Sequence, residues 1–216
     1  MTSDRHKPAG KVTPTRAVSE DELLDAAREA ILAVGWSRTT LTDVARRAGV
    51  SRMTLYRKWP DMKALLADLM TREWTESIGA SIGETTNDPD DPVDRSNPLK
   101  LLVDTMVAMI QAVRKNELLG RIVDVDPELL LPYLLNRRGR SQEFVLGIVG
   151  TQIRAGQKAG AIRKGAPELL ARSVVLAAHG FALSAHTMLD GVQDRGADVT
   201  ALDQELSELI ERYLRP

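Results

Sequence analysis

The chain has 216 residues, of which 43% are hydrophobic, so it can bury one substantial core or a small module beside a larger one. It has no uncharged apolar stretch of about 18 residues, and its start, MTSDRHKPAGKVTPTR, has no apolar segment, so we expect neither a membrane span nor a secretory signal. The chain has no cysteine, which excludes disulfides and thiolate metal sites and fits a reducing cytoplasm.

The net charge of −1 hides an uneven distribution of charge along the chain. Residues 1–60 hold 11 Lys and Arg against 7 Asp and Glu, whereas the remainder holds 18 against 23. Between Arg38 and Lys58 there are six basic residues and one acidic residue, Asp43. A basic module on an acidic body is typical of a nucleic-acid-binding head. Chance clustering on a solvated face gives the same charge pattern.

The first predicted helix begins near Ser19. Residues 1–18 are polar and contain two prolines, which predicts a flexible basic arm. Ser19 and Glu22 have capping-box spacing, and the apolar positions that follow fall on one helical face. Gly35 suits a left-handed helix end, and Trp36 after it is expected in the core.

The most informative segment is 41–59. Thr42 is placed to cap a short helix, which Gly49 ends with a tight turn that a residue without a Cβ adopts most easily. Ser51 is placed to cap a second short helix over 52–58. Two short helices joined by an Ala-Gly-Val turn form a helix-turn-helix.

The second short helix is predicted to present most of its side chains to solvent. Leu55 points inward, whereas the outward side chains offer donors, apolar groups and an aromatic ring to groove edges and phosphates. Pro60 ends the helix at Trp59, which we expect in the core, and Asp61 caps a further helix that carries Lys63. An ordinary helical hairpin with a basic rim is the alternative. The outward residues are Arg52, Met53, Thr54, Tyr56, Arg57 and Lys58.

The remainder of the chain predicts a loop followed by long helices. Residues 83–98 are rich in Pro, Asp, Asn and Ser without apolar periodicity, which predicts the loop. The helix over 167–189 is apolar nearly all round, so we expect it to be buried on several sides. The fold class is therefore all-α. The predicted helices after the loop cover 99–115, 127–137, 141–159, 167–189 and 200–214.

From about Glu22 to Met70 the sequence resembles the TetR (tetracycline repressor) family of bacterial regulators. The resemblance rests on the Ala-rich pattern before Gly35, on Thr-x-x-x-Val-Ala-x-x-Ala-Gly-Val-Ser at 40–51, on Thr-Leu-Tyr at 54–56, and on Trp-Pro-Asp-x-Lys-x-Leu-Leu at 59–66. The other two-thirds of the chain matches the family only in its all-α shape.

The resemblance implies three parts. Residues 1–18 form the basic arm, 19–66 a three-helix DNA-binding head with the helix-turn-helix, and 67–216 a helical effector-binding and dimerisation domain.

The resemblance implies a role in DNA binding for eight residues. Thr42 and Lys63 would each meet a phosphate, Thr42 through its hydroxyl or the helix amides. Residues 52–54 would enter the major groove. Tyr56 would contact a phosphate, and Arg57 a phosphate or a base. The predicted DNA-binding set is Thr42, Ser51, Arg52, Met53, Thr54, Tyr56, Arg57 and Lys63.

Two departures from the family pattern concern specificity. Many members have Gly or Ala where this chain has Met53, whose thioether is predicted to make an apolar contact, for example with a thymine methyl. Arg57 and Lys58 add charge, which predicts higher non-specific affinity and steeper salt dependence. On the arm, Lys11 and Arg16 are placed to reach an adjacent groove or backbone.

The resemblance also implies a small molecule bound within the helices after Leu99, and a homodimer formed by the last two helices. His179 and His186 share a helix without a third ligand and are interpreted as core or interface residues, not zinc ligands. Plain burial inside one protomer is the alternative for every pocket and interface residue. The candidates for the effector pocket are Met106, Met109, Phe144, Phe181 and Met188. The candidates for the dimer interface are Val174, Ala178, Phe181, Leu206 and Ile210.

The sequence therefore predicts a cytoplasmic, sequence-specific transcriptional regulator. It is expected to be a ligand-responsive repressor that binds a palindromic DNA operator as a homodimer and takes a small apolar effector, without cofactor or metal. A DNA-binding regulator with no effector is the second hypothesis, and a helical interaction adaptor, which would need no basic recognition helix, is the third. An enzyme is not expected, because the P-loop, Gly-x-Gly-x-x-Gly, His-Glu-x-x-His and Gly-x-Ser-x-Gly patterns are absent.

Overall fold

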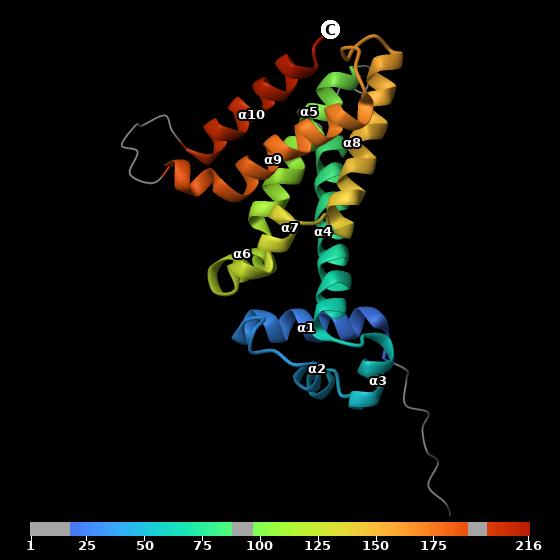
Figure 1. The fold of residues 1–216 in the computed structure, drawn as a ribbon, viewed down its shortest axis with the longest axis vertical. Coiled ribbons are helices and arrows are strands. Elements are labelled where there is room, and N and C mark those ends of the chain that lie inside the picture. Colours follow the sequence, from blue (N-terminus) through green and yellow to red (C-terminus); the bar gives the residue numbers. More distant parts are fainter. Residues whose placement is uncertain (1–17, 88–96, 190–197) are drawn as a thin grey trace, which may run out of the picture.

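The computed structural model describes residues 18–87, 97–189 and 198–216, and within them every regular element is helical. Three helices form a head at one end, and α4 rises from the head into a bundle at the other (Figure 1). The predicted all-α class is confirmed. The head holds α1 (Glu20–Val34), α2 (Leu41–Arg47) and α3 (Arg52–Lys58), from which α4 (Met62–Asn87) continues. The elements that follow are α5 (Pro98–Lys115), α6 (Glu117–Val125), a 3-10 turn (Pro127–Leu129), α7 (Leu131–Leu135), α8 (Arg140–Lys158), α9 (Pro167–Leu189) and α10 (Val199–Leu214).

The start and end of α1 follow the sequence closely. The Ser19 hydroxyl accepts from the Glu22 amide at 3.2 Å and the Glu22 carboxylate accepts from the Ser19 amide at 2.7 Å, so the predicted capping box is confirmed. Gly35 has the predicted positive φ of 89°, but its ψ of 162° is extended, not helical. A Cβ there would stand 3.0 Å from Val125 Cγ1. Trp36 is buried as predicted.

The cap of α2 differs from the prediction. Thr40, not Thr42, precedes the first helical residue, so the capping role expected of Thr42 is wrong. The Thr40 hydroxyl accepts from the Asp43 amide, and the Asp43 carboxylate accepts from the Thr40 amide, both at 3.2 Å. Thr40 has an acidic residue three positions later, whereas Thr42 has Ala45 there, so only Thr40 can form the reciprocal pair.

The turn between α2 and α3 is closed by two backbone bonds at Gly49, whose φ is 67°. The Gly49 amide donates to the Arg46 carbonyl at 3.3 Å and the Val50 amide to the Ala45 carbonyl at 3.0 Å. This is the Schellman arrangement, which satisfies carbonyls at a helix end and favours glycine. The predicted helix-turn-helix is therefore present.

The limits of α3 match the prediction. The Ser51 hydroxyl accepts from the Thr54 amide at 3.2 Å. Trp59 has extended backbone before Pro60 and is 1% exposed, so its predicted place in the core is confirmed. Asp61 caps α4 by accepting from the Ala64 amide at 2.8 Å.

Two hydrophobic cores stabilise the chain, and α6 joins the first. The head core contains apolar residues of α1 to α4 together with Leu118 and Ile122 of α6, a helix that the sequence analysis did not predict. The second core, called the body core below, packs α5, α8, α9 and α10 together. The head is therefore closed by a helix that lies far along the chain.

Helix α4 runs through two of the predicted boundaries. Residues 83–87 belong to α4, so the predicted loop begins too early, and 88–96 lie outside the described residues. The arm over 1–18 lies outside them too, apart from its last residue. The expected division at residue 66 falls inside this continuous helix.

Helix α9 is buried on one side only, which contradicts the prediction of burial on several sides. Leu170, Val174 and Val175 pack into the body core, whereas Leu169 and Leu176 are 61% and 73% exposed. Among the described residues, α9 alone is long and apolar enough to cross a membrane by those two measures. One such helix is weak evidence, because helices of globular cores pass the same test.

Candidate nucleic-acid interface and internal cavity

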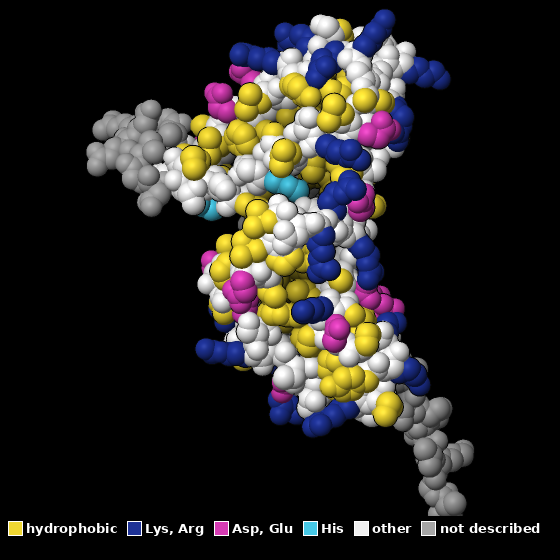
Figure 2. Space-filling view, viewed as in Figure 1, with side chains coloured by type: hydrophobic (Ala, Val, Ile, Leu, Met, Phe, Trp, Pro, Cys, Tyr) yellow, Lys and Arg dark blue, Asp and Glu magenta, His cyan; other side chains and the backbone are white. Residues whose placement is uncertain are grey.

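The outer side of α3 is an exposed face of mixed chemistry. Leu55 is fully buried, whereas Met53 and Tyr56 are 75% and 50% exposed. Arg52 and Arg57 are exposed and share the face with these two residues by helical spacing. Figure 2 shows basic side chains along this end of the molecule. We call Arg52, Met53, Tyr56 and Arg57, together with the exposed Lys63 at the start of α4, the reading face.

The basic residues of the head divide into paired and unpaired groups. Arg46 pairs with Asp43 at 2.9 Å, and Arg47 pairs with Glu29 at 3.0 Å. The unpaired cations keep their full charge for an external anion, whereas the paired ones are partly neutralised. Within the described part of the chain, no ion pair involves the cations of the reading face, which are Arg52, Arg57 and Lys63.

Lys58 belongs to the paired group. Its ammonium pairs with Glu20 at the start of α1 and lies 5.5 Å from the centre of the Trp59 ring. Lys58 therefore ties the end of α3 to α1, and Glu20 offsets part of the charge that the sequence analysis assigned to non-specific DNA affinity.

The remaining predicted DNA-binding residues occupy other settings. Thr42 is half-buried in the first turn of α2. The Ser51 and Thr54 hydroxyls lie 2.9 Å apart at the start of α3, where Ser51 also caps the helix. Lys63 is exposed at the start of α4. Lys11 and Arg16 lie outside the described residues.

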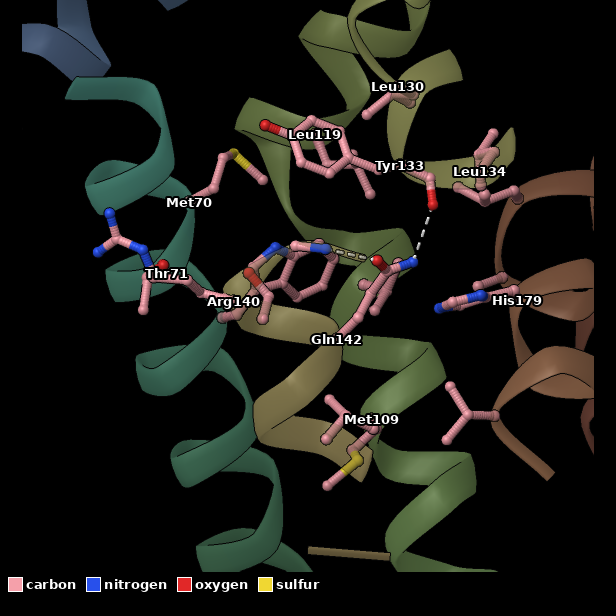
Figure 3. A pocket seen from close by; sticks show the side chains of 18 of the residues that line it. Met70, Thr71, Met109, Leu119, Leu130, Tyr133, Leu134, Arg140, Gln142 and His179 are labelled. Atoms are coloured by element: carbon pink, nitrogen blue, oxygen red, sulfur yellow. Dashed lines mark hydrogen bonds between the residues drawn. The ribbon is translucent and has the colours of Figure 1, made fainter. Parts of the chain in front are cut away.

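A cavity of about 210 Å³ lies between the two cores. Leu66, Met70 and Ile122 line it from the head core, while Met106 and Val175 line it from the body core. Figure 3 shows side chains from α4 to α9 converging on this space. Its position means that a molecule filling it would touch both halves of the chain.

The predicted pocket residues are only partly brought together. Met106 and Met109 line the cavity. Phe144 and Met188 are 43% and 66% exposed, and Phe181 packs against the body core, so these three lie outside the cavity lining. Apolar character alone did not reveal which face of α8 or α9 each one occupies.

Polar lining residues that the sequence analysis did not propose for the pocket include Arg140, Gln142 and His179. Both ends of the Gln142 amide are used, since its oxygen accepts from the Gly139 amide at 2.8 Å and its nitrogen donates to the Tyr133 carbonyl at 3.3 Å. Desolvation by burial lowers the pKa of His179, so its imidazole is neutral near pH 7.

Arg140 connects the rim of the cavity to the end of α3. Its guanidinium donates to one oxygen of Asp68 at 2.6 Å, and the indole of Trp59 donates to the other at 2.8 Å. Asp68 lies on α4, so three elements meet at one carboxylate (Figure 3 shows Arg140 near α4). Trp59, Asp68 and Arg140 are called the relay below.

A second carboxylate, Asp126 at the end of α6, holds the loop after α1. It is 2% exposed and accepts from the Trp36 amide at 2.7 Å, the Ser37 amide at 3.2 Å and the Ser37 hydroxyl. Burial opposes its charge, but these hydrogen bonds and the charge of Arg121 outweigh burial, so the pKa of Asp126 lies below its ordinary value. Sequence reasoning missed this contact because its partners are far apart in the chain.

The predicted dimer-interface residues are turned inward. Val174, Ala178, Leu206 and Ile210 are at most 4% exposed in the single chain, and Phe181 packs against the same core. Side chains already buried in their own protomer offer no surface to a partner, so the structure contradicts this assignment for Val174, Ala178, Leu206 and Ile210. Phe181 is half-buried and stays a prediction. The exposed apolar side chains of the same two helices are instead Leu169, Leu176, Met188, Leu209 and Tyr213.

Comparison with known proteins places this arrangement among regulators of transcription. Residues 23–69 match the family model for bacterial regulatory proteins of the tetR family. An uncharacterised HTH-type transcriptional regulator of Mycobacterium bovis is 32% identical over 92% of this chain and 96% of its own length.

Solved structures share the fold. The repressor SmeT of a Stenotrophomonas maltophilia multidrug efflux pump superposes with a TM-score of 0.62 at 20% identity, covering 93% of this chain and 92% of its own. The Bacillus subtilis transcriptional regulator FadR in complex with stearoyl-CoA gives 0.61 at 15% identity, covering 91% and 100%.

Proposed function

The chain belongs to the TetR family of bacterial regulatory proteins, and on that premise we propose that it is a ligand-responsive repressor that binds a palindromic operator as a homodimer. The family consists of transcriptional regulators with a DNA-binding helix-turn-helix, not of enzymes. The observation that carries the proposal is the reading face, whose three cations have no ion-pair partner within the described residues.

Direct contact with DNA is assigned to the reading face. Arg52 and Met53 enter the major groove, where the Met53 thioether offers an apolar surface to a thymine methyl. Tyr56, Arg57 and Lys63 contact phosphates, and Arg57 is long enough to reach a base edge. The exposure of all five side chains supports this assignment.

Three further predicted DNA-binding residues take supporting positions. Ser51 and Thr54 fix the start of α3 through their paired hydroxyls. Thr54 also keeps part of its predicted role in the major groove, because it is next to Met53 in the sequence. Thr42 in the first turn of α2 offers its hydroxyl or its amide to a phosphate.

Response to a ligand is supported by the location of the cavity. It is lined by residues of both cores, and Arg140 at its rim is bonded through Asp68 to Trp59 at the end of α3. A small molecule in the cavity would shift α8 relative to α4, and the relay would carry that shift to the reading face. FadR, a structural neighbour, binds stearoyl-CoA.

A homodimer is supported by the exposed apolar side chains of α9 and α10. Leu169 and Leu176 lie two turns apart on one side of α9, and Leu209 and Tyr213 lie one turn apart on α10. Large exposed apolar side chains gathered on two neighbouring helices mark an interaction surface. Pairing of these helices about a two-fold axis would present two heads to a palindromic site.

The dimer is tested by placing a charge on this surface. Leu176→Arg should convert the protein to a monomer in sedimentation velocity runs, because a guanidinium would be buried without a partner. Leu135→Arg on α7 is the matched control, since Leu135 is 74% exposed and Leu176 is 73% exposed. A dimer that survives Leu176→Arg would place the interface elsewhere.

The division of the chain follows from these roles. We keep a basic arm over 1–18, a DNA-binding head over 19–66 and an effector-binding and dimerisation domain over 67–216, and we place the protein in the cytoplasm with its DNA.

A regulator without an effector and a helical adaptor are the two alternatives. The cavity between the head core and the body core favours a ligand-binding regulator over these two alternatives.

Footprinting on the DNA that flanks the protein's own gene tests the function directly. A protected inverted repeat is expected, and Arg57→Ala should weaken binding to all sequences and flatten the salt dependence. Lys158→Ala is the control, because Lys158 is exposed at the end of α8, far from the head along the chain. An adaptor would protect no DNA. Equal salt slopes for Arg57→Ala and the wild type would remove Arg57 from the interface.

A further inference from the structure

The lining of the cavity offers no unpaired charge to a ligand. Arg140 is the one permanently charged side chain that lines it; it lies 66% exposed at the rim, where its guanidinium is paired with Asp68 at 2.6 Å. No Asp or Glu belongs to the lining within the described residues. A ligand with a formal charge would lose its hydration without gaining a partner. The lining therefore fits an uncharged molecule.

Most polar groups of the lining already have partners inside the protein. Thr71 donates to the Ala67 carbonyl at 2.6 Å, and Gln142 uses both ends of its amide. The Tyr133 hydroxyl accepts from Arg137 at 3.4 Å. Three lining side chains have no hydrogen bond to the described residues, namely Trp74, Ser141 and His179. These three, which have no hydrogen-bond partner at all among the described residues, are the candidates for a polar contact with the ligand.

His179 is the best placed of the three. Its ring extends from α9 toward Gln142, as Figure 3 shows. Ser141 is less well placed, because it follows Arg140 in the first turn of α8 and Arg140 is 66% exposed at the rim of the cavity. Trp74 packs against the body core and can only donate. A neutral imidazole both donates and accepts, and burial keeps His179 neutral near pH 7 by lowering its pKa.

We propose that the cavity binds an uncharged, largely apolar molecule that carries one hydroxyl or carbonyl group, and that His179 forms the hydrogen bond to that oxygen. The rest of the molecule lies against the apolar side chains of the two cores, including Met70, Met106 and Met109, whose flexible thioethers adapt to its shape. This inference rests on the proposed function because it names the class of the effector, but it concerns binding alone.

Isothermal titration with three probes of one shape tests the proposal. The probes are 4-butylphenol, butylbenzene and 4-butylbenzoate, which share an apolar body and differ in one group. 4-Butylphenol should bind about fivefold more tightly than butylbenzene, the gain expected of one net hydrogen bond. 4-Butylbenzoate should bind at least about tenfold more weakly than 4-butylphenol, because its charge has no free partner.

Variants locate the hydrogen bond. His179→Phe keeps an aromatic ring and should remove the preference for 4-butylphenol over butylbenzene, whereas His179→Gln, which still donates and accepts, should keep most of it. Ser141→Ala and Trp74→Phe should leave the preference unchanged. Melting temperatures close to that of the wild type show that each variant is folded.

Several outcomes would overturn the proposal. Tighter binding of 4-butylbenzoate than of 4-butylphenol would show that the ligand is anionic. A preference lost in Ser141→Ala or Trp74→Phe but kept in His179→Phe would move the hydrogen bond to another side chain, and failure of all three probes to bind would exclude the ligand class. Binding without any change in operator affinity would instead contradict the proposed ligand response and leave the ligand class standing.

Discussion

The reading face and the cavity are built in different ways, although the relay connects them. Four of the five residues of the reading face lie on one short helix, α3, and Lys63 lies at the start of α4. The limits of α3 are set by neighbours in sequence, Ser51 at its start and Pro60 after its end. The cavity is made by six helices and a 3-10 turn, and residues on its two sides, such as Met70 and His179, are far apart in the chain.

This difference has a physical consequence for the two regions. A recognition helix must present an unchanging pattern of donors to DNA, so it is held by a fully buried Leu55 and a buried Trp59. A ligand cavity needs space that no side chain of the protein fills. Here that space lies where two cores meet, so the close packing inside each core is kept. The reading face is therefore held by its own neighbours in sequence, whereas the cavity is held by the packing of two separate cores around it.

The largest expected effect comes from removing the anchor of the reading face. Trp59→Ala should lower the free energy of unfolding by about 3–5 kcal/mol, because it leaves a cavity in the head core and removes a donor from Asp68. Trp74→Ala, in a half-buried residue that lines the cavity, should cost clearly less. Urea unfolding curves measure both. Equal losses would remove the distinction between a rigid head and an adaptable cavity.

An intermediate effect is expected at the contact between α6 and the head. Asp126→Asn places an amide NH₂ against one of the donors at Trp36 and Ser37, which should cost about 1–3 kcal/mol. Asp124→Asn is the matched control, because Asp124 is exposed two residues earlier.

The pH dependence of this contact has a definite sign. The pKa of Asp126 is lowered in the folded protein, so its carboxylate contributes stability above the ordinary value of 3.8, and this stability is lost as the pH falls through the lower folded pKa. The difference in unfolding free energy between wild type and Asp126→Asn should therefore be constant near neutral pH and shrink in acid. A difference that grows in acid would contradict this account.

The smallest effect on stability, but a specific one on function, is expected from Arg140→Gln. Arg140 is 66% exposed, so breaking its pair with Asp68 should change unfolding by at most about 0.5 kcal/mol. Operator affinity without ligand should be unchanged, while the change in operator affinity caused by 4-butylphenol should be smaller than in the wild type. Arg138→Gln, which breaks an exposed pair with Glu143, is the control. An unchanged ligand response in Arg140→Gln would exclude the relay.

The sequence alone predicted most of the head. The capping box at Ser19, the limits of α3, the turn at Gly49 and the burial of Trp59 all follow from interactions within a few residues, and all are confirmed. The incorrect cap at Thr42 also concerns an interaction within a few residues, because Asp43 forms the capping box with Thr40.

The tertiary structure decided the rest of the candidate site. Which sides of α9 and α10 face inward depends on where α5 and α8 pack, so Val174 and Leu206 are buried in one protomer while Leu176 is exposed. The same holds for His179, Arg140 and the cavity that they line.

Local patterns determined the helices and the reading face, because capping, turns and helical periodicity act over a few residues. Only the tertiary structure determined which distant regions touch one another. Asp126 meets Trp36 and Arg140 meets Asp68 across long stretches of chain, and a single carboxylate in a sequence gives no sign of which distant amide or guanidinium it will bind. The family, the DNA-binding helix and two cavity residues, Met106 and Met109, could be predicted from the sequence, whereas the rest of the cavity lining and its connections to the head could not.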